Sequence, residues 1–286
     1  MKVAIIGASG QLGSDISKIF GDNAFPLSHN EIEVKDIDSC RRVLKSIDAG
    51  TVINCAAYVR VDDSEDNPEE AFMVNAIGAR NVALICNENR MKNCYISTDF
   101  VFNGEKKKLY HEDDSPNPIN IYGLSKYAGE ILTRNYCMKF YIIRSASLYG
   151  EKGSSGKGGN FVDWIVEKSS NNEIIKVVDD IVMSPTYAKD AAEMIKNMIE
   201  KEIPYGVYHV TNQGYCSWFE FAEKIFEFAE INAKLSPIKS DEFNIKAKRP
   251  KFSALDSPKL NSFGLRMRNW EDALKDYLGE KGYLVR

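Results

Sequence analysis

A tyrosine and a lysine four residues apart are the side chains of this sequence best suited to moving a proton. Tyr122 and Lys126 lie in the stretch NIYGLSKYAGE, residues 120–130. In a helix, this spacing places both side chains on one face. A free phenol has a pKa of about 10, and a neighbouring ammonium group lowers it. The pair could therefore protonate a carbonyl oxygen while a hydride reaches the carbon.

The spacing alone is not specific, because Tyr277 and Lys281 repeat it in YLGEK. We interpret the second pair as a surface tyrosine and a solvated lysine, since no partner motif accompanies it. The first pair has a partner, because Thr98 ends the predicted strand YIST about twenty-four residues before Tyr122. A hydroxyl at a strand end can bond the same carbonyl oxygen as the phenol. We therefore predict that Thr98, Tyr122 and Lys126 are catalytic.

A glycine loop near the N-terminus predicts where a nicotinamide dinucleotide binds. Gly7, Gly10 and Gly13 lie in AIIGASGQLGSDI, between a predicted strand and a predicted helix. Glycines let the backbone approach a pyrophosphate, and the helix N-terminus offers unpaired N–H groups. Residues 153–159, GSSGKGG, repeat the spacing without that context, and we interpret them as a mobile loop. The position between strand and helix therefore carries the prediction.

Apolar runs alternate with helical patterns through the first half of the chain. Strands are predicted at 2–8, 51–57, 93–98 and 140–150, with a further strand, IEVKDI, at 32–37. Helices are predicted at 11–21, 67–89 and 122–138. Near-continuous apolar strands separated by helices favour a parallel sheet covered on both faces. The fold class predicted is therefore α/β, a doubly wound, Rossmann-like parallel sheet.

The pattern changes after Gly150. Helices are predicted at 160–170, 188–201 and 217–230, and a late strand at 206–212. We expect a second, smaller α/β substrate lobe interleaved with the sheet. Residues 1–149 with about 187–213 would form the dinucleotide-binding domain, and about 150–186 with 214–286 the substrate lobe.

Composition narrows the class of protein further. The 286 residues carry a net charge of −4, which argues against a nucleic acid or an anionic membrane surface as partner. No apolar run is long enough to cross a bilayer, and MKVAIIGASG is typical of a first strand, not of a secretion signal. The six cysteines form no CxxC motif, which predicts free thiols and no metal site. We expect a cytoplasmic protein.

The motifs resemble those of dTDP-4-dehydrorhamnose reductases, a family of extended short-chain dehydrogenases/reductases, over nearly the whole chain. The more specific blocks are STDFVFNG at 97–104, SPTYA at 184–188 and AKRPKFSALD at 247–256. The resemblance implies reduction of the 4-keto group of dTDP-4-dehydro-L-rhamnose by NADPH or NADH, with Tyr122 as proton donor. It also implies Mg²⁺, for which the sequence shows no liganding cluster. A homodimer is a further expectation.

Further site residues follow from the position of the matching motifs. Including the glycine loop and the small-residue strand end NCAAY, the expected cofactor contacts are Gly7, Gly10, Gln11, Leu12, Ser28, Asp36, Ile37, Ala56, Ala57, Tyr58, Tyr122 and Lys126. The expected substrate contacts are Thr98, Asp99, Val101, Phe102, Asn160 and Arg249. Asp36 could face the adenine, cap the following helix, or both.

The cofactor preference depends on the end of the second strand, in FPLSHNE. An acidic residue there usually marks an NAD site. Here Ser28 and His29 occupy the position, with no arginine nearby for a 2′-phosphate. Both side chains can bond either group, so we predict that NADH and NADPH are both used.

Three departures from the family pattern keep alternatives open. Ser147 stands where the family has a tryptophan near the sugar, Val59 where threonine is common, and Phe100 where tyrosine is common. Another aromatic residue could replace the missing ring, with Tyr149, Phe161 and Trp164 as candidates. The alternatives are another nucleotide-sugar 4-ketoreductase or epimerase, or a regulatory subunit that binds cofactor without turnover. A dehydratase is disfavoured, because related dehydratases carry an acid at the position of Phe100.

Overall fold

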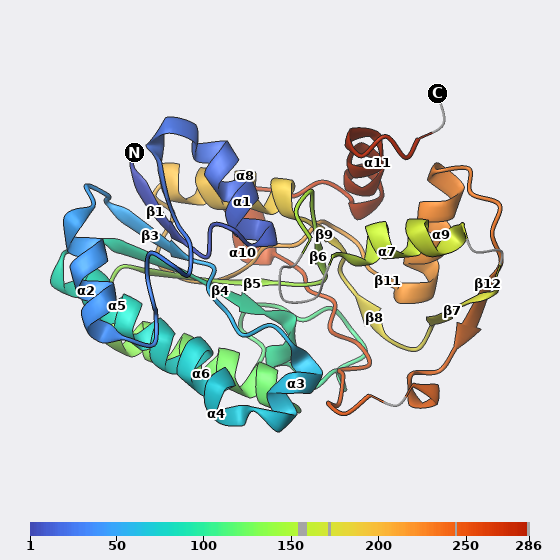
Figure 1. Cartoon of the computed structure of the whole chain (residues 1–286), viewed down its shortest axis with the longest axis horizontal. Coiled ribbons are helices and arrows are strands. Elements are labelled where there is room, and N and C mark those ends of the chain that lie inside the picture. Colours follow the sequence, from blue (N-terminus) through green and yellow to red (C-terminus); the bar gives the residue numbers. More distant parts are fainter. Residues whose placement is uncertain (154–158, 171–172, 244, 285–286) are drawn as a thin grey trace.

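The computed structural model describes residues 1–153, 159–170, 173–243 and 245–284, and its larger part is built on a six-stranded sheet (Figure 1). The strands are β1 (Val3–Ile6), β2 (Ala24–Leu27), β3 (Thr51–Asn54), β4 (Lys92–Thr98), β5 (Phe140–Ser145) and β10 (Gly206–His209). They are all parallel, in the order β10-β5-β4-β3-β1-β2. The strand order reverses at β1, and ligands bind doubly wound sheets at such a switch point.

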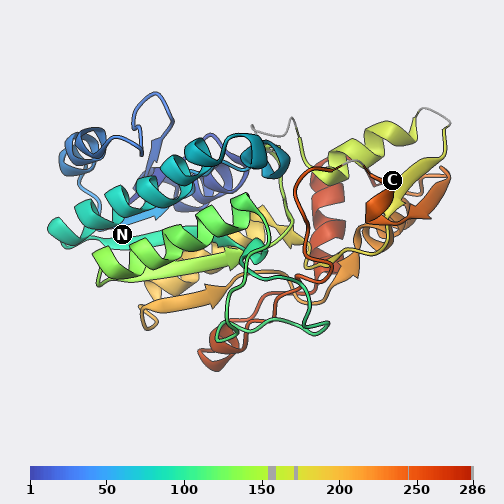
Figure 2. The same ribbon diagram turned by 90° about the horizontal axis from the view of Figure 1, so that it is seen from below.

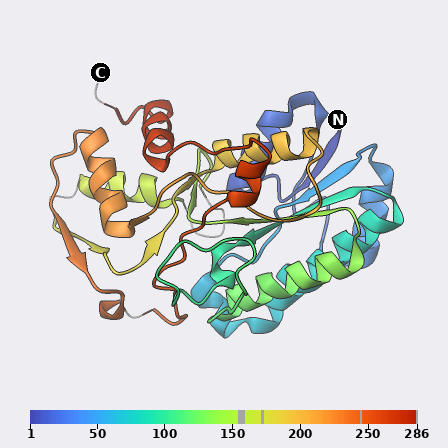
Figure 3. The same cartoon turned by 180° about the vertical axis from the view of Figure 1, so that it is seen from behind.

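Helices cover both faces of this sheet. Val3 and Ile5 of β1 point into the core beneath α1 (Gln11–Phe20), α8 (Ala188–Glu200) and α10 (Pro258–Ser262). Ala4 and Ile6 point to the other face, which is covered by α2 (Ile37–Ser46) and α5 (Ala79–Glu88). Helix α6 (Ile121–Tyr136) packs beside α5 on that face (Figures 2 and 3). The predicted doubly wound, Rossmann-like sheet is confirmed.

A smaller lobe lies beyond the carboxyl ends of the strands (Figures 1 and 2). Its core packs three helices, α7 (Phe161–Ser169), α9 (Trp218–Phe228) and α11 (Trp270–Glu280). Two short sheets complete it, with β7 (Ile175–Val178) beside β12 (Leu235–Ile238) and β8 (Val182–Met183) beside β11 (Cys216–Ser217). Between the two parts, β6 (Leu148–Tyr149) pairs with β9 (Thr186–Tyr187).

The remaining described elements are short. They are η1 (Gly21–Asn23), α3 (Val61–Asp66), α4 (Pro68–Phe72), the π-helical turn η2 (Met73–Gly78), η3 (Asp99–Val101) and η4 (Ser240–Glu242). The predicted helix at 67–89 is thus α4, η2 and α5 in succession. The middle of the second glycine repeat, 154–158, lies outside the described residues.

Two predictions about the fold are wrong. Residues 32–35 form a loop and a turn, not a strand, because β2 at 24–27 takes the place beside β1. The alternation in IEVKDI arises because Ile32 and Val34 are both buried in the core under α2. The chain after 214 does not stay in the small lobe, because Leu260 and Leu265 pack into the core of the large sheet.

Two further observations bear on the sequence predictions. All six cysteines are unpaired. Among the described residues, no helix combines the length and the apolar character needed to cross a bilayer.

Candidate active site

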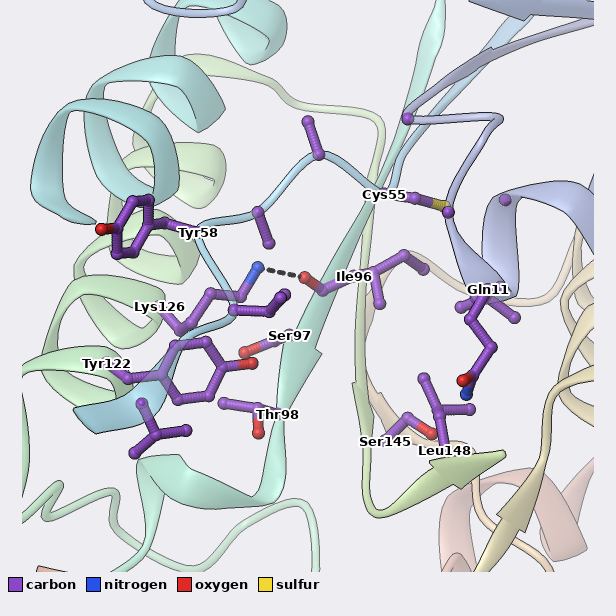
Figure 4. Close-up of a pocket in the computed structure, with 18 of the residues that line it drawn as sticks. Gln11, Cys55, Tyr58, Ile96, Ser97, Thr98, Tyr122, Lys126, Ser145 and Leu148 are labelled. Atoms are coloured by element: carbon purple, nitrogen blue, oxygen red, sulfur yellow. Dashed lines mark hydrogen bonds between the residues drawn. The ribbon is translucent and has the colours of Figure 1, made fainter. Parts of the chain in front are cut away.

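A cavity of about 820 Å³ opens where the carboxyl ends of β1, β3, β4 and β5 face the small lobe. Tyr122, Lys126 and Thr98 lie on one side of it, and Gln11 of α1 and Leu148 lie on the other (Figure 4). The cavity therefore brings the predicted proton donor and the predicted dinucleotide loop to one site.

The glycine loop is packed so closely that side chains would not fit. Gly7 has a φ of +77°, and an added Cβ there would lie 3.0 Å from the backbone nitrogen of Ala56. A Cβ on Gly13 would lie 2.3 Å from the carbonyl oxygen of Gly7. Helix α1 begins after Gly10 without a side-chain cap. Its first N–H groups therefore suit an anionic group such as a pyrophosphate.

The end of β3 supplies the neighbouring wall. Ala56, Ala57 and Tyr58 all line the cavity. The Asn54 Oδ1 accepts a hydrogen bond from the Ala56 N–H at 3.1 Å, and Tyr58 N–H donates to Asn75 Oδ1 at 2.8 Å. These bonds hold small side chains and a fixed backbone beside the glycine loop, as a bound dinucleotide requires.

The phenol of Tyr122 faces the cavity from the first turn of α6. Asn120 caps α6 by accepting a hydrogen bond from Gly123 N–H at 2.7 Å, which places Tyr122 in the first turn against the cavity. Burial raises the pKa of Tyr122 to about 12, while a hydrogen bond with Thr98 lowers it and the charge of Asp99 raises it. The phenol therefore carries its proton at neutral pH.

Lys126 lies one turn further along α6 and is only 2% exposed. Its Nζ donates to the carbonyl oxygen of Ile96 at 2.6 Å (Figure 4) and lies 4.2 Å from the centroid of the Tyr95 ring. Burial lowers the pKa of Lys126 to about 7, against the opposing charge of Glu130. Its ammonium group thus titrates close to neutral pH.

A buried ion pair, which was not foreseen from the sequence, supports this lysine. Arg144 of β5 donates from Nε and Nη2 to the two carboxylate oxygens of Glu130, at 2.9 and 2.8 Å. Ser97 donates to the same carboxylate. Glu130 follows Lys126 by four residues, which is the one sequence signal that could have indicated it. Breaking such a pair leaves a buried charge, so it fixes α6 against β4 and β5.

The strand-end threonine is held in place by its neighbours. Thr98 Oγ1 donates to Asp99 Oδ1 at 3.0 Å and accepts from Phe100 N–H at 3.2 Å. The other carboxylate oxygen of Asp99 accepts from Ser253. The segment 247–256 is thereby tied to the floor of the site.

Three expected cofactor contacts, Asp36, Ile37 and Ser28, do not line the cavity. Asp36 caps α2, with its Oδ1 accepting from Asp38 N–H at 2.9 Å, and Ile37 packs against the core under α2. The cavity wall there carries residues 32–35 instead. The backbone N–H of Ser28 donates to Glu31 at 2.6 Å, and His29, not Ser28, lines the cavity.

The expected substrate contacts at Val101 and Phe102 need correction. Both side chains are fully buried, in a core cluster that includes Tyr110 and Leu255. The Phe102 ring stacks on Tyr110 with centroids 4.2 Å apart. The turn η3 directs the side chains of Val101 and Phe102 away from the cavity and into this core cluster.

The two polar residues expected near the nucleotide differ in position. Asn160 lies on the cavity wall and caps α7, but its amide already donates to Gly150 and Tyr277, at 3.0 and 2.9 Å. Arg249 is not on the wall. Its guanidinium makes a bidentate pair with Asp62 of α3, at 2.6 and 2.7 Å, and holds the pKa of that carboxyl at about 2.

Aromatic side chains of the small lobe form the wall opposite the sheet. Phe161, Trp164, Trp218 and Phe221 line the cavity, and the Phe161 and Trp218 ring centroids are 4.7 Å apart. Trp218 and Phe221 were not among the expected site residues, although the aromatic face of the helix at 217–230 was visible in the sequence. Ser147 lines the same cavity, with a left-handed φ of +43°.

The described residues contain no group of three or more His, Cys, Asp or Glu side chains that could hold a metal ion. The structure therefore gives no fit for the Mg²⁺ that the resemblance implies, and no catalytic step is assigned to it.

Fold and site together define an extended short-chain oxidoreductase, with a dinucleotide loop at the switch point and a Tyr–Lys pair facing it. A family model described as RmlD substrate binding domain matches residues 1–282. The chain belongs to this family, that of the dTDP-4-dehydrorhamnose reductases.

Individual relatives cover nearly the whole chain. It is 36% identical to the spore coat polysaccharide biosynthesis protein SpsK of Bacillus subtilis, over 98% of both chains. It is 32% identical to the dTDP-4-dehydrorhamnose reductase of Aggregatibacter actinomycetemcomitans, over 96% of this chain and 97% of the relative. The crystal structure of dTDP-4-dehydrorhamnose reductase from Bacillus anthracis in complex with NADP matches with a TM-score of 0.93 and 39% identity, over 98% of this chain and 100% of that one.

Proposed function

We propose that the protein reduces the 4-keto group of dTDP-4-dehydro-L-rhamnose to give dTDP-L-rhamnose, with NADPH or NADH as the reductant. The observation that carries the chemistry is the cavity shared by the glycine loop, Thr98 and the Tyr122–Lys126 pair. The choice of sugar nucleotide follows from membership of the family, because fold alone does not fix a substrate.

Each catalytic side chain has one task in this proposal. The bound reduced nicotinamide supplies a hydride to C4 of the sugar. Tyr122 gives its proton to the ketone oxygen, which becomes the hydroxyl group, and Thr98 holds that same oxygen. The ammonium of Lys126 stabilises the phenolate that remains on Tyr122.

Binding is divided between the two parts of the chain. Residues 1–149 with about 187–213 would hold the cofactor through Gly7, Gly10, Gln11, Leu12, Ala56, Ala57 and Tyr58, all of which line the cavity. Thr98 and Asp99 would contact the sugar, and the aromatic wall of the small lobe would cover the rest of the nucleotide. Stacking on such rings suits a planar base.

The direct test is an assay of NADPH oxidation with purified protein and several dTDP-4-keto sugars. We expect the highest kcat/KM for dTDP-4-dehydro-L-rhamnose. The specific claim fails if that sugar is turned over far more slowly than another 4-keto sugar. If the protein binds the cofactor but oxidises no NADPH with any of these sugars, it would instead be a regulatory subunit.

Ser147→Trp examines the sugar side separately. The substitution puts the family's ring into the cavity wall, at a position whose φ of +43° is strained for any side chain. We expect the KM for the sugar nucleotide to change while the Kd for cofactor stays within about twofold, an interaction change well below 1.4 kcal/mol. Equal changes in both constants would mean that Ser147 does not line the sugar subsite.

A cytoplasmic homodimer completes the proposal. The six unpaired cysteines support a reducing compartment. Leu124 and Ile131 lie seven residues apart on the outer face of α6 and are 43% and 41% exposed, which supports an apolar contact between two copies. A monomeric mass by light scattering at micromolar concentration would refute the dimer.

A further inference from the structure

Four ionisable side chains line the cavity at the end next to β2. His29 and Glu33 follow that strand, Lys35 comes two residues later, and Glu70 reaches in from α4. None of them takes part in the proton transfer. In doubly wound folds, the side chains just after the second strand meet the adenosine ribose. This end of the cavity is therefore where a 2′-hydroxyl or a 2′-phosphate would lie.

The geometry of the cluster is defined by Lys35. Its Nζ lies 2.8 Å from Glu70 Oε1 and 3.9 Å from Glu33 Oε2. The backbone N–H of Lys35 also donates to Glu33 Oε1 at 3.0 Å, which fixes the two residues relative to each other. The Lys35 side chain is 30% exposed, so its ammonium is accessible from the cavity.

The net charge of these four side chains does not favour the binding of a doubly negative phosphate group. Two carboxylates, of Glu33 and Glu70, stand against the one ammonium of Lys35, and His29 lies 3.7 Å from Glu33. A 2′-hydroxyl can donate to either carboxylate and leave the ion pair intact. A 2′-phosphate carries only acceptor oxygens near neutral pH and needs the lysine.

We propose that Lys35 receives the 2′-phosphate of NADPH and that Glu70 competes with the phosphate for this lysine, so that the Lys35–Glu70 ion pair sets the preference between NADPH and NADH. The inference rests on the proposed function only in its use of a nicotinamide dinucleotide. It also gives a physical basis, through a residue not considered from the sequence, for the predicted use of both cofactors by a cavity whose described lining contains no arginine.

Titration of NAD⁺ and NADP⁺ into the purified protein tests the inference without any sugar. Lys35→Gln should weaken NADP⁺ binding about tenfold and change NAD⁺ binding less than about twofold, the size expected for one partly exposed charge pair. Glu70→Gln should tighten NADP⁺ binding about fivefold, because the lysine is then unopposed on that side.

The double variant separates competition from a general effect of charge. If Glu70 acts through Lys35, then Glu70→Gln in the Lys35→Gln background should change NADP⁺ binding less than about twofold. A matched control is Glu202→Gln in the exposed Lys92–Glu202 pair, which removes the same charge outside the active-site cavity and should leave both affinities unchanged.

Two results would overturn the inference. The first is an unchanged ratio of the two affinities in Lys35→Gln, whether both cofactors are weakened equally or neither is weakened. The second is the full Glu70→Gln effect persisting without Lys35. A failure of sugar reduction would leave all of these measurements intact, so the two proposals can fail separately.

Discussion

Two Tyr–Lys pairs of identical spacing lie in very different surroundings. Tyr122 and Lys126 of α6 face the cavity, close to Thr98. Tyr277 and Lys281 lie at the end of α11 in the small lobe, and Tyr277 is fully buried, so its interpretation as a surface residue was wrong.

The phenol of Tyr277 forms hydrogen bonds both as a donor and as an acceptor. It donates to Asp163 at 2.8 Å and accepts from the amide of Asn160 at 2.9 Å, while Lys281 Nζ lies 3.1 Å from the same aspartate. Burial raises the pKa of Tyr277, as it raises that of Tyr122. A raised pKa therefore does not distinguish the two tyrosines. They differ in that the phenol of Tyr122 faces a cavity shared with the glycine loop.

Removing each phenol oxygen should separate the two pairs most strongly. We expect Tyr122→Phe to fold, to bind cofactor and to lose about 10²- to 10⁴-fold in kcat, the usual worth of general acid catalysis. The matched Tyr277→Phe should keep kcat within about twofold, because its phenol contacts no reacting atom. Near-wild-type turnover of Tyr122→Phe would defeat the assignment of the proton donor.

For the free energy of unfolding we expect the opposite order, with the larger loss in Tyr277→Phe. Tyr277→Phe removes one hydrogen-bond partner from each of Asn160 and Asp163, and we expect the free energy of unfolding to fall by about 1–3 kcal/mol. Tyr122→Phe should cost less than about 1 kcal/mol, since its phenol borders a cavity where water can replace it. Urea denaturation of both variants measures the difference, and a larger loss for Tyr122→Phe would contradict this account of the lobe.

The two lysines differ in how their burial couples to pH. The pKa of Lys126 is lowered to about 7, whereas in the unfolded chain it is near about 10.4. Between these values the unfolded state binds more protons, so the cost of burying Lys126 is present in full below pH 7 and diminishes as pH rises. Relative to Lys126→Met, the wild type should gain about 1 kcal/mol per pH unit between pH 7 and 9.

The matched variant for this measurement is Lys281→Met, because Lys281 is partly exposed and pairs with Asp163. Unfolding free energies of the three proteins at several pH values give the comparison. A difference between the wild type and Lys126→Met that stays constant with pH would show that Lys126 keeps its proton in the folded state throughout this range.

Some expectations failed because a local pattern has more than one structural solution. Ile32 and Val34 alternate as a strand would, yet they are two anchors of a loop. Phe102 lies three residues after Asp99 of the site, but its side chain points into the core. Arg249 was expected near the nucleotide and is instead paired with Asp62, a residue far from it in sequence. The periodicity of a segment indicates its own secondary structure, but not which other part of the chain it packs against.

The sequence by itself predicted the class of sheet, the glycine loop and the grouping of Thr98 with Tyr122 and Lys126. Short contiguous apolar runs that alternate with helical patterns are typical of buried parallel strands, glycines at fixed spacing permit a turn that other residues rarely adopt, and residues four apart lie on one face of a helix. The tertiary structure alone decided which Tyr–Lys pair faces a cavity, that Glu130 and Arg144 brace α6, and that Trp218 and Phe221 complete the wall. These outcomes depend on which side chains from distant parts of the chain pack together and exclude water, and no single stretch of sequence contains that information.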